Sequence, residues 1–175
     1  MLHLDTNKLS GTIPLSLTNL SKLNDLGLQR NHDLSGHIPW EIGNKLTKLQ
    51  ILNLWGNQLS GNIPNSIGNC SNLTILNLSR NQLSGMVPME LGKLGLLQRL
   101  RIQHNQLISG SSSTLTFLTA LTNCSNLEQI VVSYNYLSGV LPFSIGQLSS
   151  KLDSFTLSNN NISGSIPQQI VNLTD

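Results

Sequence analysis

The chain has 175 residues, of which 10% are charged, and its formal net charge is +2. This net charge is too small for a nucleic-acid-binding protein, because such proteins depend on a strongly basic surface. The sequence has no apolar run of 18 or more residues, so it predicts no membrane-spanning helix.

One sequence motif recurs along the whole chain with a period of about 24 residues. Its clearest copy begins at Leu73 and follows the pattern LxxLxLxxNxLSGxIPxxLxxL. One asparagine column consists of Asn7, Asn31, Asn57, Asn81, Asn105, Asn135 and Asn160. All six prolines form a second column, at Pro14, Pro39, Pro64, Pro88, Pro142 and Pro167. Such a repeat predicts a solenoid, in which each copy buries the leucines of its neighbours.

Each part of the repeat motif predicts its own structural element. The alternating leucines indicate a short strand with one face buried, and the column asparagine is expected to bond backbone groups in a stacked ladder. Ser-Gly is expected to turn the chain, and the last leucines favour a 3₁₀ or short helical turn. The predicted fold is therefore an α/β repeat solenoid, a right-handed superhelix with a concave parallel β-sheet and short helical turns on the convex side.

In chain order, the copies span residues 1–22, 23–48, 49–72, 73–96, 97–126, 127–151 and 152–175 and form a single domain. Copy two has extra residues near His32 and Asn44, which indicate small bulges, and copy six has one near Ser149. Copy five has no proline and carries an insertion at about 108–122. Its polar stretch 109–114 is expected to be a mobile loop, and residues 115–121 a longer helical turn.

The non-leucine positions of each strand are expected to point outward on the concave face. All four arginines of the chain fall on this face, whereas the six lysines fall at turns or on the outer arc. Arginine pairs well with carboxylates and sulfates, and arginine, tryptophan and tyrosine are favoured at interface hot spots. The predicted ligand-binding residues are Trp55, Arg80, Arg99, Arg101, His104, Tyr134 and Arg30.

The LSGxIP part of the repeat motif resembles the plant-specific class of leucine-rich repeat. Residues 116–125 and the Asn-Ile-Ser-Gly of the last copy resemble the extracellular domains of plant receptor-like kinases of the pattern-sensing immune group. The resemblance implies an extracellular or plasma-membrane location in the parent protein, a perceived ligand and a co-receptor kinase of the same repeat class. Kinase motifs, a signal peptide and the paired cysteines of the family's caps are absent from the sequence. We therefore expect a piece of a longer extracellular domain or a truncated relative.

These features favour a ligand-recognition module of a receptor-like kinase or receptor-like protein, with a peptide, protein or anionic oligosaccharide as ligand. The alternative is a defence protein that resembles the polygalacturonase inhibitors, although a positive concave face opposes pairing with a basic enzyme. Ice binding and a fragment without function are lesser alternatives. No spacing of residues indicates catalysis, a metal site or a cofactor.

Seven asparagines open an Asn-x-Ser/Thr sequon, a density that fits a secreted glycoprotein. Asn77 is set aside because it falls on a concave strand. The remaining glycosylation candidates are Asn19, Asn69, Asn72, Asn123, Asn161 and Asn172. Cys70 and Cys124 lie two copies apart, roughly 10 Å at the spacing of strands, which is too far for a disulfide. They are expected to be small buried hydrophobic residues.

Overall fold

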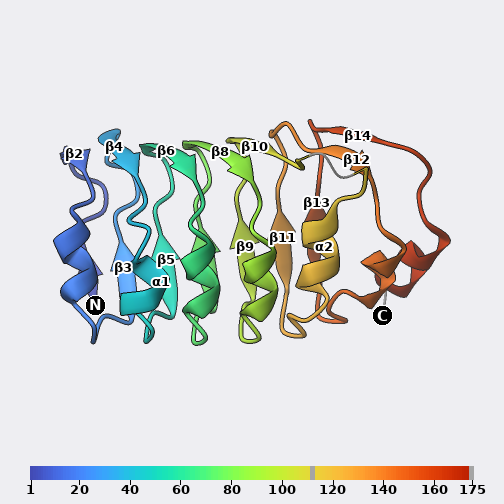
Figure 1. Cartoon of the computed structure of the whole chain (residues 1–175), viewed down its shortest axis with the longest axis horizontal. Helices are drawn as coiled ribbons and strands as arrows, with labels where there is room; N and C mark the ends of the chain where they lie inside the picture. Colours follow the sequence, from blue (N-terminus) through green and yellow to red (C-terminus); the bar gives the residue numbers. More distant parts are fainter. Residues whose placement is uncertain (111–112, 174–175) are drawn as a thin grey trace.

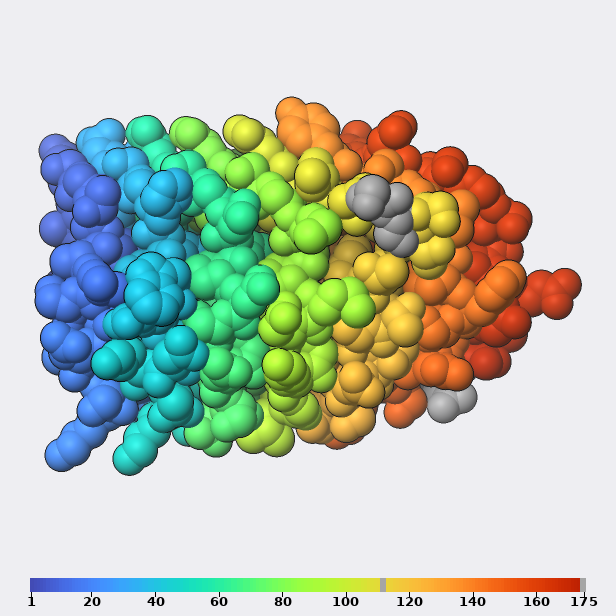
Figure 2. All heavy atoms as spheres, viewed as in Figure 1, coloured from blue at the N-terminus to red at the C-terminus, as the bar shows by residue number. Residues whose placement is uncertain are grey.

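The chain forms an elongated stack of turns in the computed structural model, which describes residues 1–110 and 113–173 (Figure 1). The two termini lie at opposite ends of the stack, and successive copies are neighbours along its length (Figure 2). The predicted solenoid is therefore confirmed.

Seven parallel strands form one continuous sheet, the concave sheet, in the order of the copies. The strands are β1 (Leu2–His3), β3 (Asp25–Gly27), β5 (Ile51–Asn53), β7 (Ile75–Asn77), β9 (Arg99–Arg101), β11 (Gln129–Val131) and β13 (Ser154–Thr156). Leu52 lies opposite Leu76, and Leu76 opposite Leu100, so the leucines stack in register. All three are fully buried, as the alternating pattern predicts.

The Ser-Gly segments form a second set of parallel strands, and the expectation that they simply turn the chain is wrong. Five of these strands form the lateral sheet, namely β2 (Ser10–Thr12), β4 (Asp33–His37), β6 (Gln58–Asn62), β8 (Gln82–Met86) and β10 (Gln106–Ile108). Extended segments of neighbouring copies lie side by side, and their pairing satisfies backbone groups that would otherwise lack partners. Glycine still matters here, because Gly61 and Gly85 have φ of +74° and +73°.

Copy five interrupts the second set of strands. β12 (Ser138–Val140) and β14 (Asn161–Ser163) form a separate two-stranded sheet. Across the gap, the described residues contain only two isolated bridges, Ile108 to Tyr136 and Thr114 to Val140. On copy five, the two bridged residues, Ile108 and Thr114, both belong to the insertion at about 108–122. The expected mobile loop at 109–114 includes residues 111 and 112, which lie outside the described residues.

Short helical turns cover the convex side, as predicted. They are η1 (Leu15–Asn19), α1 (Ile42–Lys45), η2 (Asn65–Asn69), η3 (Met89–Lys93), α2 (Thr116–Leu121), η4 (Phe143–Gln147) and η5 (Gln168–Leu173). The turns in copies two and five are α-helical instead of 3₁₀, because these copies carry extra residues there. The extra residue near Asn44 thus lies within a helical turn.

The core is one continuous cluster of buried leucine, isoleucine, valine, phenylalanine and cysteine. A Cβ atom at Gly92 would collide with the carbonyl oxygen of Ala120 in the next turn, so glycine permits the close approach of turns. Cys70 and Cys124 are buried and free, and each thiol donates to a backbone carbonyl. Burial raises the pKa of both thiols to about 11.

The column asparagines form the predicted ladder. Asn105 Oδ1 accepts from the amide of Leu83 at 3.0 Å, and its Nδ2 donates to the carbonyls of Leu78 and Ile102 at 3.0 and 3.1 Å. Asn135 makes the equivalent three bonds one copy further along the stack. From Asn31 onward, each ladder asparagine thus joins its own copy to the preceding one.

Candidate ligand-binding face

Side chains on the exposed face of the concave sheet alternate with buried leucines. On β9, Leu100 is fully buried, whereas Arg99 and Arg101 on either side of it are partly exposed. Because β9 pairs in register with β7 and β11, Asn77 lies beside Arg101, and Gln129 lies beside Arg99. The sheet therefore presents both arginines among polar neighbours on one surface.

The residue before each ladder asparagine adopts a left-handed backbone conformation. These residues have φ between 52° and 69° and are Thr6, Arg30, Gly56, Arg80, His104, Tyr134 and Asn159. One such residue lies three positions after the end of each concave strand and directly precedes the ladder asparagine. The conformation costs a residue with a Cβ roughly 1–2 kcal/mol relative to the right-handed region. Only copy three has glycine at this position, so the other six copies carry this backbone strain, four of them at a large side chain.

The arginines of β9 have polar partners on copy six. Arg99 Nε lies 3.6 Å from the carboxylate of Glu128, and Arg101 Nη2 donates to the side-chain oxygen of Gln129. Glu128 was not among the predicted site residues, because it stands one position before the strand. Its carboxylate offsets part of the positive charge of this surface.

Aromatic rings stack on the same surface in two places. The guanidinium of Arg30 lies 5.6 Å from the ring centroid of Trp55, which is a cation–π contact. The rings of His104 and Tyr134 are stacked, with centroids 4.2 Å apart and planes at 10°. Stacking leaves Tyr134 about half exposed, at 49% of its area.

The predicted residues therefore form two groups along the sheet. Trp55 pairs with Arg30 toward the N-terminal end. His104 and Tyr134 belong to copies five and six, together with Arg99, Arg101 and their partners. Arg80 is exposed on copy four between the two groups.

The part of the chain that the structure describes contains no group of three or more His, Cys, Asp or Glu side chains placed to hold a metal ion. His3 instead lies 3.0 Å from the carboxylate of Asp25 on the adjacent strand. Among residues 1–110 and 113–173, no helix is both long and apolar enough to cross a bilayer.

All six candidate glycosylation sites are exposed, at Asn19, Asn69, Asn72, Asn123, Asn161 and Asn172. Asn77 is only partly exposed, and its Oδ1 accepts from the amide and the hydroxyl of Ser79. Its geometry agrees with setting it aside.

Models of the leucine-rich repeat family match residues 47–107, 126–148 and 151–173, which together are more than half of the chain. The LRR receptor-like serine/threonine-protein kinase EFR of Arabidopsis thaliana is 51% identical over 65 residues, which are 37% of this chain and 6% of EFR. The crystal structure of PEPR1-AtPEP1 is 38% identical with a TM-score of 0.89 over 99% of this chain and 23% of that one.

The Arabidopsis receptor kinase HAESA, in complex with the peptide hormone IDA and the co-receptor SERK1, is 34% identical with a TM-score of 0.86. The match covers 98% of this chain and 27% of the HAESA chain. The chain thus spans a small part of the relatives that it matches.

Proposed function

The chain belongs to the leucine-rich repeat family, and on this basis we propose that it is a ligand-recognition segment of the extracellular domain of a plant receptor-like kinase or receptor-like protein. The ligand is a peptide or protein that presents an anionic group to the concave sheet. An anionic oligosaccharide offers the same chemistry. The observation that carries the proposal is the set of arginine and aromatic side chains on adjacent concave strands.

Among the residues that the structure describes, three of the four concave arginines have no carboxylate partner. Within residues 1–110 and 113–173 the ion pairs are His3 with Asp25 and Arg99 with Glu128. The guanidinium groups of Arg30, Arg80 and Arg101 are therefore left to pair with a ligand. A guanidinium forms two parallel hydrogen bonds with a carboxylate or sulfate, which gives both strength and orientation.

Stacked rings add apolar contact area beside this charge. The pair formed by His104 and Tyr134 has fixed ring planes, so a ligand that packs on Tyr134 orders few additional torsions. An anionic residue held by Arg101 and an apolar residue packed on Tyr134 would suit a short peptide. This combination favours the peptide or protein ligand over the oligosaccharide.

Related receptors suggest further partners and a location. The HAESA structure contains a peptide hormone and a co-receptor. By analogy, we place this segment outside the plasma membrane, with a co-receptor kinase of the same repeat class as an additional partner. Six exposed sequons support an extracellular location.

The proposal is tested by binding of the secreted, glycosylated chain to a panel of acidic peptides and oligogalacturonides. The variant carries Arg80→Ala, Arg99→Ala and Arg101→Ala. A control of equal charge change carries Lys45→Ala, Lys48→Ala and Lys93→Ala, three exposed positions away from the concave face. We expect the arginine variant to lose affinity at least tenfold, on the order expected for hot-spot residues, and the lysine control to keep it.

Equal losses in both variants would indicate unspecific attraction of charge and refute the proposal. Binding that neither variant weakens would exclude the concave arginines as the ligand site. Preference for oligogalacturonides over all peptides would identify an oligosaccharide receptor or a wall-associated inhibitor.

A further inference from the structure

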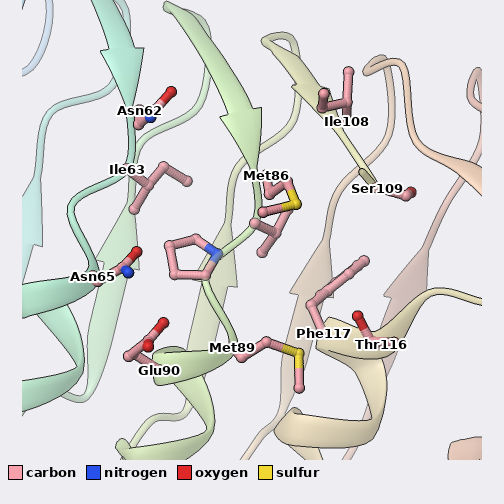
Figure 3. A pocket seen from close by; sticks show the side chains of 12 residues that line it. Asn62, Ile63, Asn65, Met86, Met89, Glu90, Ile108, Ser109, Thr116 and Phe117 are labelled. Atoms are coloured by element: carbon pink, nitrogen blue, oxygen red, sulfur yellow. The ribbon is translucent and has the colours of Figure 1, made fainter. Parts of the chain in front are cut away.

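A recess of about 410 Å³ lies away from the concave sheet, and none of its lining residues belongs to a concave strand. It opens between the ends of β6, β8 and β10 on one side and the first residues of η3 and α2 on the other (Figure 3). The concave face and this recess, the lateral groove, are thus separate surfaces.

The insertion in copy five supplies one side of the groove, because Ile108, Ser109, Thr116 and Phe117 all belong to it. In copies three and four, two residues link the lateral strand to the helical turn. In copy five the link from Ile108 to Thr116 is made by residues 109–115. Ser109 and Thr116, at the two ends of this link, both line the groove (Figure 3). Equivalent positions of other copies, some of them with two-residue links, line further recesses of about 520 and 450 Å³, so the insertion changes the lining of this recess and is not required for a recess to form.

The groove exposes three large apolar side chains around a buried one. Met86, Met89 and Ile108 are 61%, 49% and 43% exposed, whereas Phe117 is buried beneath them. Methionine adapts its flexible side chain to irregular partners and is common on surfaces that bind peptides. Three such side chains around one recess indicate a contact surface.

The charge of the groove favours a cationic ligand, whereas the concave face favours an anionic one. Glu90 is the single ionisable side chain among the lining residues, and its carboxylate forms no ion pair within the described ranges. No lysine or arginine lines the groove. None of the seven sequons lies among the lining residues, so N-glycans at these sites would not be attached inside it.

We propose that the lateral groove docks an extended segment of a partner protein that carries an apolar side chain next to a lysine or arginine. The apolar side chain packs between Met86, Met89 and Ile108, and the cation pairs with Glu90. A basic segment is selected because the groove offers one unpaired carboxylate and no competing cation. This site is independent of the concave ligand site, and both can be occupied at once.

The methionines provide a direct assay, because the chain has only three. In protein labelled with ¹³C at the methionine methyl groups, Met86 and Met89 report the groove, and Met1 serves as an internal reference. The probes are acetylated, amidated hexapeptides with one fixed leucine. One set has lysine and the matched set has glutamate at each neighbouring position.

Two variant pairs test the two parts of the groove. Glu90→Gln removes the carboxylate, and Glu41→Gln changes the equivalent residue of copy two, which also follows proline and one apolar residue. Met89→Gln removes apolar surface, and Phe143→Gln changes the equivalent exposed position of copy six, which lies in a different recess. Far-UV circular dichroism of each variant checks that the fold is retained.

We expect lysine peptides to shift the Met86 and Met89 signals saturably, without shifting Met1, and to bind about fivefold tighter than glutamate peptides. Glu90→Gln should abolish this preference, and Met89→Gln should weaken binding by about fivefold or more, whereas both controls behave as the wild type. Equal binding of the two peptide sets, or binding unchanged in Glu90→Gln, would overturn the proposal. So would the absence of any shift, or shifts that follow protein concentration alone, which would identify a second copy of the chain as the occupant.

Discussion

Replacing Asn105 with alanine should destabilise the protein strongly, because one side chain satisfies backbone groups of two copies. The amide of Leu83 loses its acceptor and is left buried without a partner. The carbonyls of Leu78 and Ile102 each lose one donor. Each of these carbonyls keeps a second donor, from Asn81 and Asn135 respectively.

The magnitude follows from these separate losses. An orphaned buried amide costs about 1–3 kcal/mol, and a lost bond at a carbonyl that keeps another donor costs about 0.5 kcal/mol. The expected loss in free energy of unfolding for Asn105→Ala is therefore roughly 2–4 kcal/mol. Asn7→Ala is the matched control, because Asn7 is exposed and bonds only to Leu4 and Asp5 within its own copy. Its loss should stay below about 1 kcal/mol.

Urea unfolding of both variants measures the two free energies, and hydrogen exchange of single amides locates the effect. The Leu83 amide should exchange faster in Asn105→Ala, while the Leu107 amide, which donates to Asn135, should change much less. Equal destabilisation by Asn7→Ala and Asn105→Ala would refute the ladder as the source of stability. Unchanged protection of the Leu83 amide would do the same.

Three further changes test the packing, the strained column and the buried thiols. Gly92→Ala should cost about 1–3 kcal/mol in urea unfolding, because the new Cβ collides with the next turn, whereas Gly95→Ala, with open space around it, should be close to neutral. Arg80→Gly should be about 1 kcal/mol more stable than Arg80→Ala in the same assay, because glycine adopts a positive φ without strain; equal stabilities would contradict this account. The raised pKa values of Cys70 and Cys124 stabilise the fold fully below the thiol pKa of 9.0, and this contribution should be lost as the pH rises from there toward about 11. Urea midpoints should therefore fall above pH 9 in the wild type and fall less in a variant with both cysteines replaced by alanine.

The spacing of leucine, asparagine and proline was enough to predict the solenoid, the concave sheet and the ladder. The leucines and the asparagine recur in all seven copies and the proline in six, so one sequence contains several independent observations of each. The lateral sheet was missed because Ser-Gly is also a frequent turn dipeptide. Its pairing depends on the next copy lying alongside, which a local pattern does not reveal.

The candidate site was predicted only as a set of outward positions. The alternation of the strands places Arg99 and Arg101 on the surface, but it gives no information on their partners. Glu128 reaches Arg99 from outside the strand, and Trp55 turns toward Arg30. The left-handed column was also missed, because arginine, histidine and tyrosine carry no sign of a positive φ that glycine would have suggested. The lateral groove takes part of its lining from the insertion in copy five and the rest from copies three and four, and the length of the insertion does not reveal this juxtaposition.

The interruption of the lateral sheet has a mechanical consequence for the stack. Copies one to five pair with one another in both the concave and the lateral sheet. Copies six and seven pair in the concave sheet and in their own two-stranded sheet. Between copies five and six, the concave sheet and the ladder are continuous, whereas the lateral strands pair only through two isolated bridges among the described residues. Under tension along the axis, or during fraying from the C-terminal end, we expect the stack to separate first at this junction. A receptor segment built in this way would yield as two rigid blocks, with the concave arginines Arg99 and Arg101 on the last copy before the joint.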